Sequence, residues 1–284
     1  MEIKKVGVVG CGIMGSGIAQ VCAQSGYQVV VLEVNDELLN KGLSSISSFL
    51  TKGIERGKLS QQDKDSTLAR IKGTTNIQDF GDCDLVIEAI IEDMDSKKKI
   101  FAELDKICPN HAILATNTSS LSVIDIAGAT TRLDKVVGMH FFNPVPIMRL
   151  LELVKTIATS DETLETANNF SKSLGKSVII AKDTPGFLTA RLATLLRLEV
   201  IRMLEAGLAT AEDIDTALKL GYGHPMGTLE LTDLVGLDTS LFIANAMYET
   251  TKDPKFAPPV LLQKMVAAGW LGRKTGKGFY EYNK

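Results

Sequence analysis

Two residues inside apolar runs have side chains suited to acid–base chemistry. His140 lies near the end of Val136-Val-Gly-Met-His-Phe-Phe, and an imidazole exchanges protons near physiological pH. Glu152 lies within Leu150-Leu-Glu-Leu-Val, where an unpaired carboxylate is costly to bury. A buried Glu152 can orient the imidazole of His140 and stabilise its protonated form. The alternatives are a structural histidine and a glutamate on the surface of an edge strand.

Ser119 is a third candidate, because it directly follows another apolar run. It stands in Asn117-Thr-Ser-Ser, after Ala112-Ile-Leu-Ala-Thr. Ligands of open parallel sheets bind beyond the carboxyl ends of the strands, where Ser119 can bind a substrate or a nicotinamide ring. An N-cap for a helix from Leu121 accounts for the residue equally well.

A glycine motif indicates binding of a dinucleotide. Gly10-Cys-Gly12-Ile-Met-Gly15 follows the apolar run 6–9 and opens a helical pattern. In such a motif the glycines permit a tight turn, close approach to a pyrophosphate and close packing of helix on strand. The helix N-terminus favours phosphate. Glu33 ends the next apolar run, where it can bind ribose hydroxyls and repel a 2′-phosphate, which favours NAD over NADP. The alternative is a glycine-rich turn of an ordinary βαβ unit.

Composition excludes several classes of protein. The chain has 284 residues, of which 45% are apolar and 23% charged, as in ordinary globular proteins. The net charge of −3 gives no general attraction for nucleic acid or an anionic membrane. No apolar run approaches the roughly 18 residues of a membrane span, and the first predicted strand starts too early for a signal peptide. The four cysteines and three histidines lack metal-ligand spacing, so we expect free thiols, a cytoplasmic location and no metal.

The elements that must position these residues alternate along the chain. We expect strands over 6–9, 29–32, 84–91, 112–116, 136–142, 150–154 and 178–181, and helices over 35–71 (one or two), 96–107 and 161–174. This alternation predicts an α/β fold with a mainly parallel, doubly wound sheet of Rossmann type. After Lys182-Asp-Thr-Pro-Gly, helical patterns replace strands, and Thr210 with Asp213 resembles a helix start. We therefore predict a nucleotide-binding domain over 1–184 and an all-helical domain over 185–284.

Taken together, seven motifs resemble the L-3-hydroxyacyl-CoA dehydrogenase family, and within it the short bacterial 3-hydroxybutyryl-CoA dehydrogenases of clostridial type. The resemblance runs over the whole chain. The motifs are Gly10-x-Gly12-x-x-Gly15-Ser-Gly-Ile-Ala, Glu88-Ala-Ile-Ile-Glu92, Asn117-Thr-Ser119-Ser120, His140-Phe-Phe-Asn143-Pro, Pro185-Gly-Phe, His224-Pro-Met-Gly and Gly272-Arg-Lys274-Thr-Gly-Lys-Gly-Phe-Tyr.

The resemblance implies an activity. It is the NAD(H)-dependent interconversion of (S)-3-hydroxyacyl-CoA, such as 3-hydroxybutyryl-CoA, and 3-oxoacyl-CoA, such as acetoacetyl-CoA, in fatty-acid or butyrate metabolism. It also implies dimerisation through the C-terminal domain, with the active site in the cleft between domains. By position, His140 would be the general base in oxidation and the acid in reduction, paired with Glu152. Ser119 would contact both the 3-oxygen of the substrate and the cofactor.

Further ligand contacts are implied by the same resemblance. The implied cofactor-binding residues are Gly10, Gly12, Ile13, Met14, Gly15, Glu33, Glu92, Lys97, Asn117, Ser119, Asn143 and Lys274. Lys52, Arg56 and Lys58 form a basic group in an acidic protein, which is either a solvated helix face or a site for a polyanionic ligand tail. Lys52 and Arg56 fall where basic residues of the family meet the CoA phosphates.

The chain departs from the family at one position that matters for chemistry. Many members have Asn-Arg after Pro-Gly-Phe, with the amide near the substrate oxygen, whereas this chain has Ala190-Arg191. Alanine cannot donate that hydrogen bond. A smaller departure is Thr228, where proline often follows His-Pro-Met-Gly. Two rival functions therefore stay open: an NAD-dependent dehydrogenase of a non-CoA hydroxy acid, and a catalytically weak NAD-binding homologue.

Overall fold

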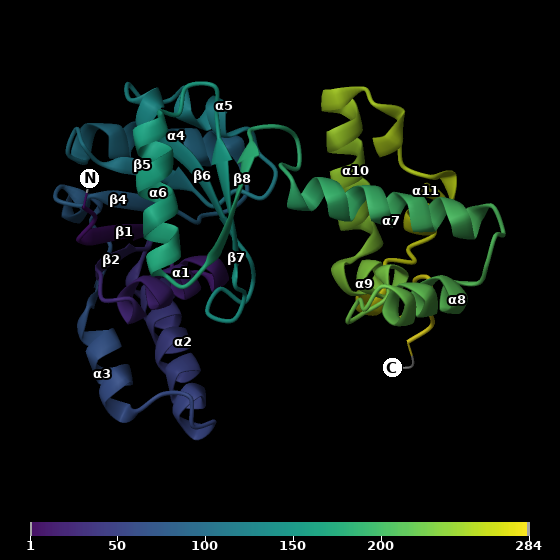
Figure 1. The fold of residues 1–284 in the computed structure, drawn as a ribbon, viewed down its shortest axis with the longest axis horizontal. Helices are drawn as coiled ribbons and strands as arrows, with labels where there is room; N and C mark the ends of the chain where they lie inside the picture. The colour runs from purple at the N-terminus through teal and green to yellow at the C-terminus, as the bar shows by residue number, and fades with distance from the viewer. Residues whose placement is uncertain (1, 283–284) are drawn as a thin grey trace. The chain divides into compact units, whose positions relative to one another are not determined.

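The computed structural model describes residues 2–282, and the chain divides between Phe187 and Leu188 into two compact units (Figure 1).

The first unit is built on one eight-stranded sheet in the order β3-β2-β1-β4-β5-β6-β7-β8. Its strands are β1 (Lys5–Val9), β2 (Gln28–Leu32), β3 (Ile71–Thr74), β4 (Leu85–Glu88), β5 (Ile113–Thr116), β6 (Val136–Phe141), β7 (Leu150–Lys155) and β8 (Ser177–Lys182). Neighbouring strands are parallel except β6 and β7, which run antiparallel.

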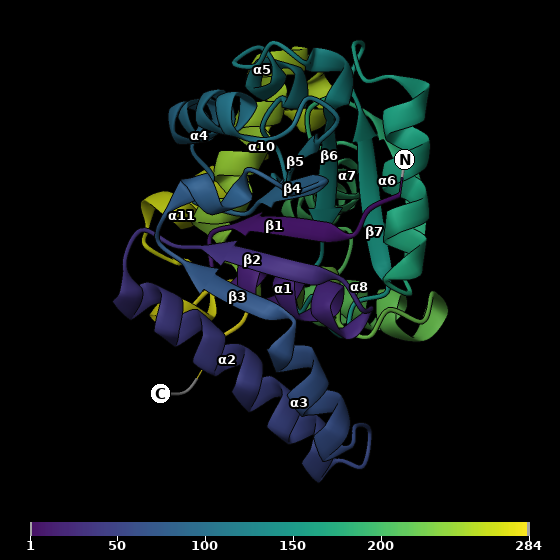
Figure 2. The same ribbon diagram turned by 90° about the vertical axis from the view of Figure 1, so that its left-hand side faces the viewer.

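Helices cover the sheet. They are α1 (Ile13–Gln24), α2 (Asp36–Glu55), α3 (Gln61–Ala69), α4 (Met94–Ile107), α5 (Val123–Ala127) and α6 (Asp161–Ser173), with the 3-10 turns η1 (Ile77–Phe80) and η2 (Leu133–Lys135). Figure 2 shows β4, β1, β2 and β3 following one another, with α2 and α3 alongside the β3 edge.

Successive strand residues enter two separate cores, as the period of two in a β-strand requires. Val8 packs in a cluster with Ile18 of α1 and Phe170 of α6. Its neighbour Val9 belongs to a second cluster, with Phe101 of α4. The two clusters give the sheet an apolar core on both faces, and this confirms the predicted α/β, doubly wound class.

Two features of the sheet differ from the sequence-based expectation. Strand β3 was not predicted, because Ile-Lys-Gly-Thr is short and has no apolar alternation; its pairing with β2 makes it a strand. The reversed direction of β7 was not predicted either. The connection from Phe141 to Leu150 is shorter than the dozen residues that a parallel crossover needs, and this was the signal for reversal.

The second unit is helical. Its elements are α7 (Thr189–Glu205), α8 (Ala211–Thr216), η3 (Ala217–Gly221), α9 (Thr228–Val235), α10 (Leu237–Thr251), η4 (Pro254–Phe256), α11 (Val260–Ala267) and η5 (Arg273–Thr275). Among its described residues, 188–282, β-pairing is limited to the isolated bridges Gly272↔Lys277 and Lys277↔Glu281. Thr210 caps α8 by accepting from the N–H of Asp213, so the predicted helix start is confirmed.

A buried carboxylate fastens the C-terminal tail to these helices. Asp233, which is 1% exposed, accepts from the backbone N–H groups of Phe279 and Tyr280 and from the hydroxyl of Tyr282. Burial, together with the hydrogen bond to Asp233 and the charge of Asp233, raises the pKa of Tyr282 to about 12. Within residues 2–282, none of the helices has the length and apolar character that crossing a membrane requires.

Candidate active site

The glycine loop between β1 and α1 is open on its outer side. Gly10 has φ +94°, and a Cβ there would lie 2.8 Å from the carbonyl oxygen of Ala89. A Cβ on Gly15 would lie 1.8 Å from the carbonyl oxygen of Gly10, so only glycine lets α1 pack this closely. A Cβ on Gly12 would meet nothing within 4 Å. Gly12 therefore leaves room for a ligand beside the loop, and the residues present fit a pyrophosphate.

Glu33 lies beside this loop, at the end of β2. Its Oε1 accepts from the N–H of Cys11 at 2.7 Å, and its Oε2 accepts from the N–H of Val34 at 3.0 Å. Burial, together with the charge of Glu33, raises the pKa of the Cys11 thiol to about 12. Cys11 is thus an inert small residue.

Large apolar side chains are exposed at the same edge of the sheet. Ile13, Val34 and Ile91, which follow β1, β2 and β4, are 76%, 82% and 70% exposed. Met14 is half-buried beside Ile13. Apolar surface at the carboxyl ends of parallel strands is suited to the flat rings of a nucleotide.

His140 and Glu152 occupy opposed positions on β6 and β7. Nδ1 of His140 lies 3.0 Å from Oε2 of Glu152, and the glutamate is fully buried. The imidazole ring packs against the rings of Phe142 and Phe187, at centroid distances of 4.5 Å and 6.2 Å. With Nδ1–H donating to the carboxylate, Nε2 is left as a proton acceptor. The expected pairing of a buried Glu152 with His140 is present.

Ser119 lies in the loop after β5 and is held by Glu92. Oε1 of Glu92 accepts from the N–H of Ser119 at 2.9 Å and lies 3.2 Å from its hydroxyl. The cap of α5 is Ser122, so the alternative that Ser119 is a helix cap is wrong. Burial pushes the pKa of Glu92 upward, but the hydrogen bond from Thr118 and the charge of Lys97 outweigh it and hold that pKa below its ordinary value.

Lys97 is almost completely buried, with 1% of its side chain exposed. Its Nζ lies 2.6 Å from Oε1 of Glu88 and 3.4 Å from Oε2 of Glu92. The sequence indicated Glu88 only as part of a family motif and not as a site residue. The available signal was a carboxylate in the apolar run Leu85-Val-Ile-Glu, the same signal that indicated Glu152.

Asparagines complete the edge of this site. Oδ1 of Asn117 accepts from the N–H of Phe141 at 2.9 Å, which ties the end of β5 to the end of β6. Asn143 is exposed in the loop after β6, and its peptide bond to Pro144 is cis. Lys274 belongs to the second unit, where its Nζ lies 2.5 Å and 2.6 Å from the two carboxylate oxygens of Asp238.

A basic pocket of about 780 Å³ lies elsewhere in the first unit. The basic residues that line it are Lys52, Arg56, Lys58, Arg149 and Lys176, and its described lining holds no carboxylate. Phe49 adds an aromatic wall. The loop between β6 and β7 forms one side, and Nζ of Lys176 donates to the carbonyl oxygens of Val145 and Met148 at 2.6 Å and 2.8 Å. The sequence did not indicate Arg149 and Lys176, because they lie far along the chain from Lys52.

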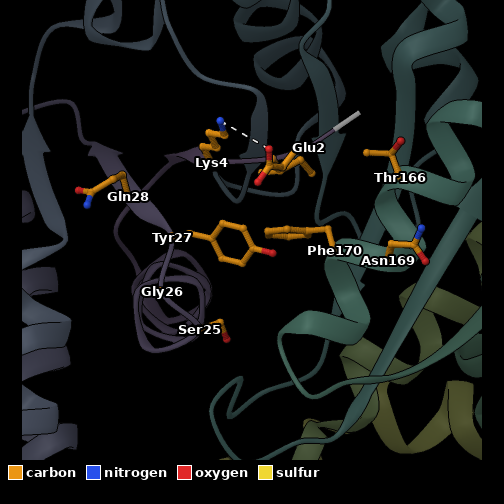
Figure 3. Close-up of a pocket in the computed structure, with 10 residues that line it drawn as sticks. Glu2, Lys4, Ser25, Gly26, Tyr27, Gln28, Thr166, Asn169 and Phe170 are labelled. Atoms are coloured by element: carbon orange, nitrogen blue, oxygen red, sulfur yellow. Dashed lines mark ion pairs between the residues drawn. The ribbon is translucent and has the colours of Figure 1, made fainter.

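A second hollow, of about 580 Å³, lies at the amino ends of β1 and β2. Figure 3 shows the rings of Tyr27 and Phe170 side by side there, tilted by 58° with centroids 5.0 Å apart. None of the predicted site residues lines this hollow. Within residues 2–282 no three His, Cys, Asp or Glu side chains form a group that could hold a metal ion, and the four cysteines are free.

Comparison with known proteins identifies close relatives. The family model described as 3-hydroxyacyl-CoA dehydrogenase, NAD binding domain matches residues 5–184, and the C-terminal domain model of the same description matches residues 186–282. A 3-hydroxybutyryl-CoA dehydrogenase of Mycobacterium tuberculosis is 45% identical over 282 residues, which is 99% of each chain. The mitochondrial hydroxyacyl-coenzyme A dehydrogenase of Sus scrofa is also 45% identical, over 99% of this chain and 91% of that protein. The crystal structure of (S)-3-hydroxybutyryl-CoA dehydrogenase from Ralstonia eutropha aligns with a TM-score of 0.96 at 46% identity, and the alignment covers 100% of both chains.

Proposed function

Because the chain belongs to the 3-hydroxyacyl-CoA dehydrogenase family, whose members are NAD-dependent oxidoreductases, we propose that it interconverts (S)-3-hydroxybutyryl-CoA and acetoacetyl-CoA. The observation that carries the proposal is the buried His140–Glu152 pair, on a sheet whose glycine loop is open to a dinucleotide. The family relationship confirms the resemblance seen in the sequence.

The proposed chemistry is proton transfer by the chain and hydride transfer to a bound cofactor. In oxidation, Nε2 of His140 removes the proton of the 3-hydroxyl group, and the carboxylate of Glu152 stabilises the resulting imidazolium. Bound NAD⁺ supplies the acceptor for the hydride that leaves C3. The hydroxyl of Ser119 binds the 3-oxygen and fixes its position. General acid–base catalysis of this kind contributes about 10²–10⁴-fold, and positioning contributes much of the rest.

The proposed cofactor site is the carboxyl edge of the sheet. Gly10, Gly12 and Gly15 with the backbone of Ile13 and Met14 receive the pyrophosphate, supported by the open space beside Gly12. Glu33 receives the ribose hydroxyls. The remaining proposed cofactor contacts are Glu92, Lys97, Asn117, Ser119, Asn143 and Lys274.

The basic pocket supports a CoA substrate. Lys52 and Arg56 line it together with three further bases, and a CoA tail carries several phosphate charges that such a pocket would bind. Phe49 offers a face for the adenine ring. We assign Lys52 and Arg56 to the phosphates, so this part of substrate recognition belongs to the nucleotide-binding domain of residues 1–184.

We also propose a homodimer or larger homo-oligomer, located in the cytoplasm. Several large apolar side chains of the second unit are exposed, among them Leu192, Leu196, Leu234, Val235 and Phe242. An exposed apolar surface of this kind is typical of an interface between protein chains. The four free thiols support a reducing compartment.

The direct test is oxidation of NADH in the presence of acetoacetyl-CoA, followed at the absorbance of NADH. We expect turnover with acetoacetyl-CoA, much weaker turnover with free acetoacetate, and preference for NADH over NADPH. Turnover of a small hydroxy acid in preference to every acyl-CoA would support the first rival function. Tight NADH binding without turnover of any acyl-CoA would support the second, for which Ala190 is the specific observation.

A further inference from the structure

We propose that Glu88 is a positioning residue that acts through Lys97 and Glu92 to fix Ser119 for contact with the 3-oxygen of the substrate. This inference rests on the proposed function, because it takes the role of Ser119 from there. Glu88 lies at the end of β4 and is fully buried.

Glu88 joins three segments of the first unit at the carboxyl edge of the sheet. Its Oε1 accepts from the N–H of Ile90 at 2.8 Å and from Nζ of Lys97 at 2.6 Å. Its Oε2 accepts from the hydroxyl of Thr116, at the end of β5, at 2.7 Å. Burying such a charge is expensive unless it is paired, and these three donors satisfy both carboxylate oxygens of Glu88.

Lys97 places one positive charge between two carboxylates. Its Nζ is closer to Glu88, at 2.6 Å, than to Glu92, at 3.4 Å. Two carboxylates and one ammonium leave one negative charge in excess. Because Glu88 holds the ammonium, Glu92 keeps a carboxylate oxygen free for other donors.

That oxygen, Oε1 of Glu92, accepts several hydrogen bonds from the loop after β5. It accepts from the hydroxyl of Thr118 at 2.6 Å and from the N–H groups of Ser119 and Ser120 at 2.9 Å and 3.3 Å. The hydroxyl groups of Ser119 and Ser120 are further donors, at 3.2 Å and 3.5 Å. Oε1 therefore stays satisfied when the hydroxyl of Ser119 turns away to donate to a substrate oxygen.

Removing the charge of Glu88 should weaken this arrangement. In Glu88→Gln, the Glu92 carboxylate becomes the only charged partner of Lys97 in the cluster. Glu88 then no longer competes with Glu92 for the ammonium of Lys97. The carboxylate of Glu92 therefore moves away from the loop and toward Lys97 on α4. The loop at residues 118–120 loses a common acceptor and becomes more mobile.

The test combines hydrogen exchange with kinetics on the full chain. We compare wild type, Glu88→Gln, Ser119→Ala and the double variant. The matched control is Asp105→Asn, which removes a half-buried carboxylate on α4 that is paired with Arg132 and not with the Ser119 loop. If Glu88→Gln does not fold, Glu88→Asp takes its place, because its shorter side chain keeps the charge but withdraws the carboxylate from Nζ of Lys97.

We expect Glu88→Gln to speed amide hydrogen exchange at residues 118–120. We also expect it to lower kcat by about 10-fold, because moving a positioning group such as the Ser119 hydroxyl by about 1 Å can cost up to roughly 10²-fold in rate. In the Ser119→Ala background the same change should lower kcat by less than about 2-fold, because residues that act through one another are not additive. Asp105→Asn should leave exchange at residues 118–120 and kcat unchanged.

Unchanged exchange at residues 118–120 in Glu88→Gln would overturn the inference. The inference would also be overturned if the fold-loss of kcat in the double variant equalled the product of the fold-losses in Glu88→Gln and Ser119→Ala. Glu88 would then affect kcat independently of Ser119. Failure of the proposed function would be seen separately, as absence of acyl-CoA turnover by the wild-type enzyme, while the exchange measurement would still report on the link from Glu88 to the loop.

Discussion

His140 and Glu152 face each other across the one antiparallel pair of strands in the sheet, β6 and β7, with Nδ1 and Oε2 3.0 Å apart. Opposed residues of an antiparallel pair have their side chains on the same face, so the backbone register itself brings the imidazole and the carboxylate together. The reversal of β7 therefore brings together the pair to which we assign proton transfer.

The first prediction concerns the charge of Glu152. In Glu152→Gln the amide keeps a similar shape but cannot stabilise an imidazolium, and kcat with acetoacetyl-CoA should fall by about 10²-fold or more. The NADH dissociation constant should stay within about 2-fold of wild type, since a 2-fold change is well under 1 kcal/mol. Steady-state kinetics and NADH fluorescence titration measure the two quantities. Wild-type kcat in this variant would show that the carboxylate has no part in proton transfer.

Gly12→Ala tests the nucleotide loop without disturbing the fold. The added Cβ meets nothing within 4 Å in the protein, so the melting temperature should not fall, whereas a pyrophosphate beside the loop would be displaced and NADH affinity should drop by about 10-fold or more. Gly221→Ala is the matched control, because its Cβ also meets nothing within 4 Å and it lies in η3 of the second unit. Equal NADH affinity in wild type and Gly12→Ala would place the cofactor elsewhere.

Neutralising the basic pocket tests the nature of the substrate. Lys52→Gln/Arg56→Gln should raise KM for acetoacetyl-CoA by about 10-fold, because charge-assisted contacts to phosphate are lost. KM for acetoacetyl-pantetheine, which lacks the nucleotide, should not change. Lys41→Gln is the control, since Lys41 lies on the same helix α2 but does not line the pocket. An equal rise in KM for both substrates would argue against a role in binding phosphate.

Ala190→Asn restores the amide found in many relatives. Ala190 is half-buried in the first turn of α7, so we expect the variant to fold with a melting temperature close to that of wild type. We expect kcat to rise, because a donor near a reacting oxygen can contribute about 10²-fold in rate. Unchanged kcat would mean that another group already provides the hydrogen bond.

The elements with strong apolar patterns could be predicted from the sequence. Strands such as β4 and β6 are fully buried apolar runs, and α6 begins at a serine cap, so local signals and tertiary structure agree there. Strand β3 could not be predicted, because four residues with a lysine and a glycine carry no periodic signal. Its structure depends on pairing with β2.

The site was predictable in part for a related reason. Glu152 was recognised because a carboxylate in an apolar run requires a partner, and the partner is His140. Ser119 and Glu92 are 27 residues apart in sequence and come into contact because two loops lie side by side. No local sequence pattern predicts a contact of this kind. The basic pocket combines α2 with loops that lie far along the chain, so only Lys52, Arg56 and Lys58, which lie close together in sequence, were visible in advance.

The most direct test of the proposed acid–base role is the kcat of His140→Gln with acetoacetyl-CoA and NADH, measured beside its NADH affinity. Glutamine retains a polar side chain but cannot transfer a proton in this way. We predict that kcat falls by about 10²–10⁴-fold while NADH binding stays nearly intact. Wild-type turnover by this variant would contradict the assignment of proton transfer to His140.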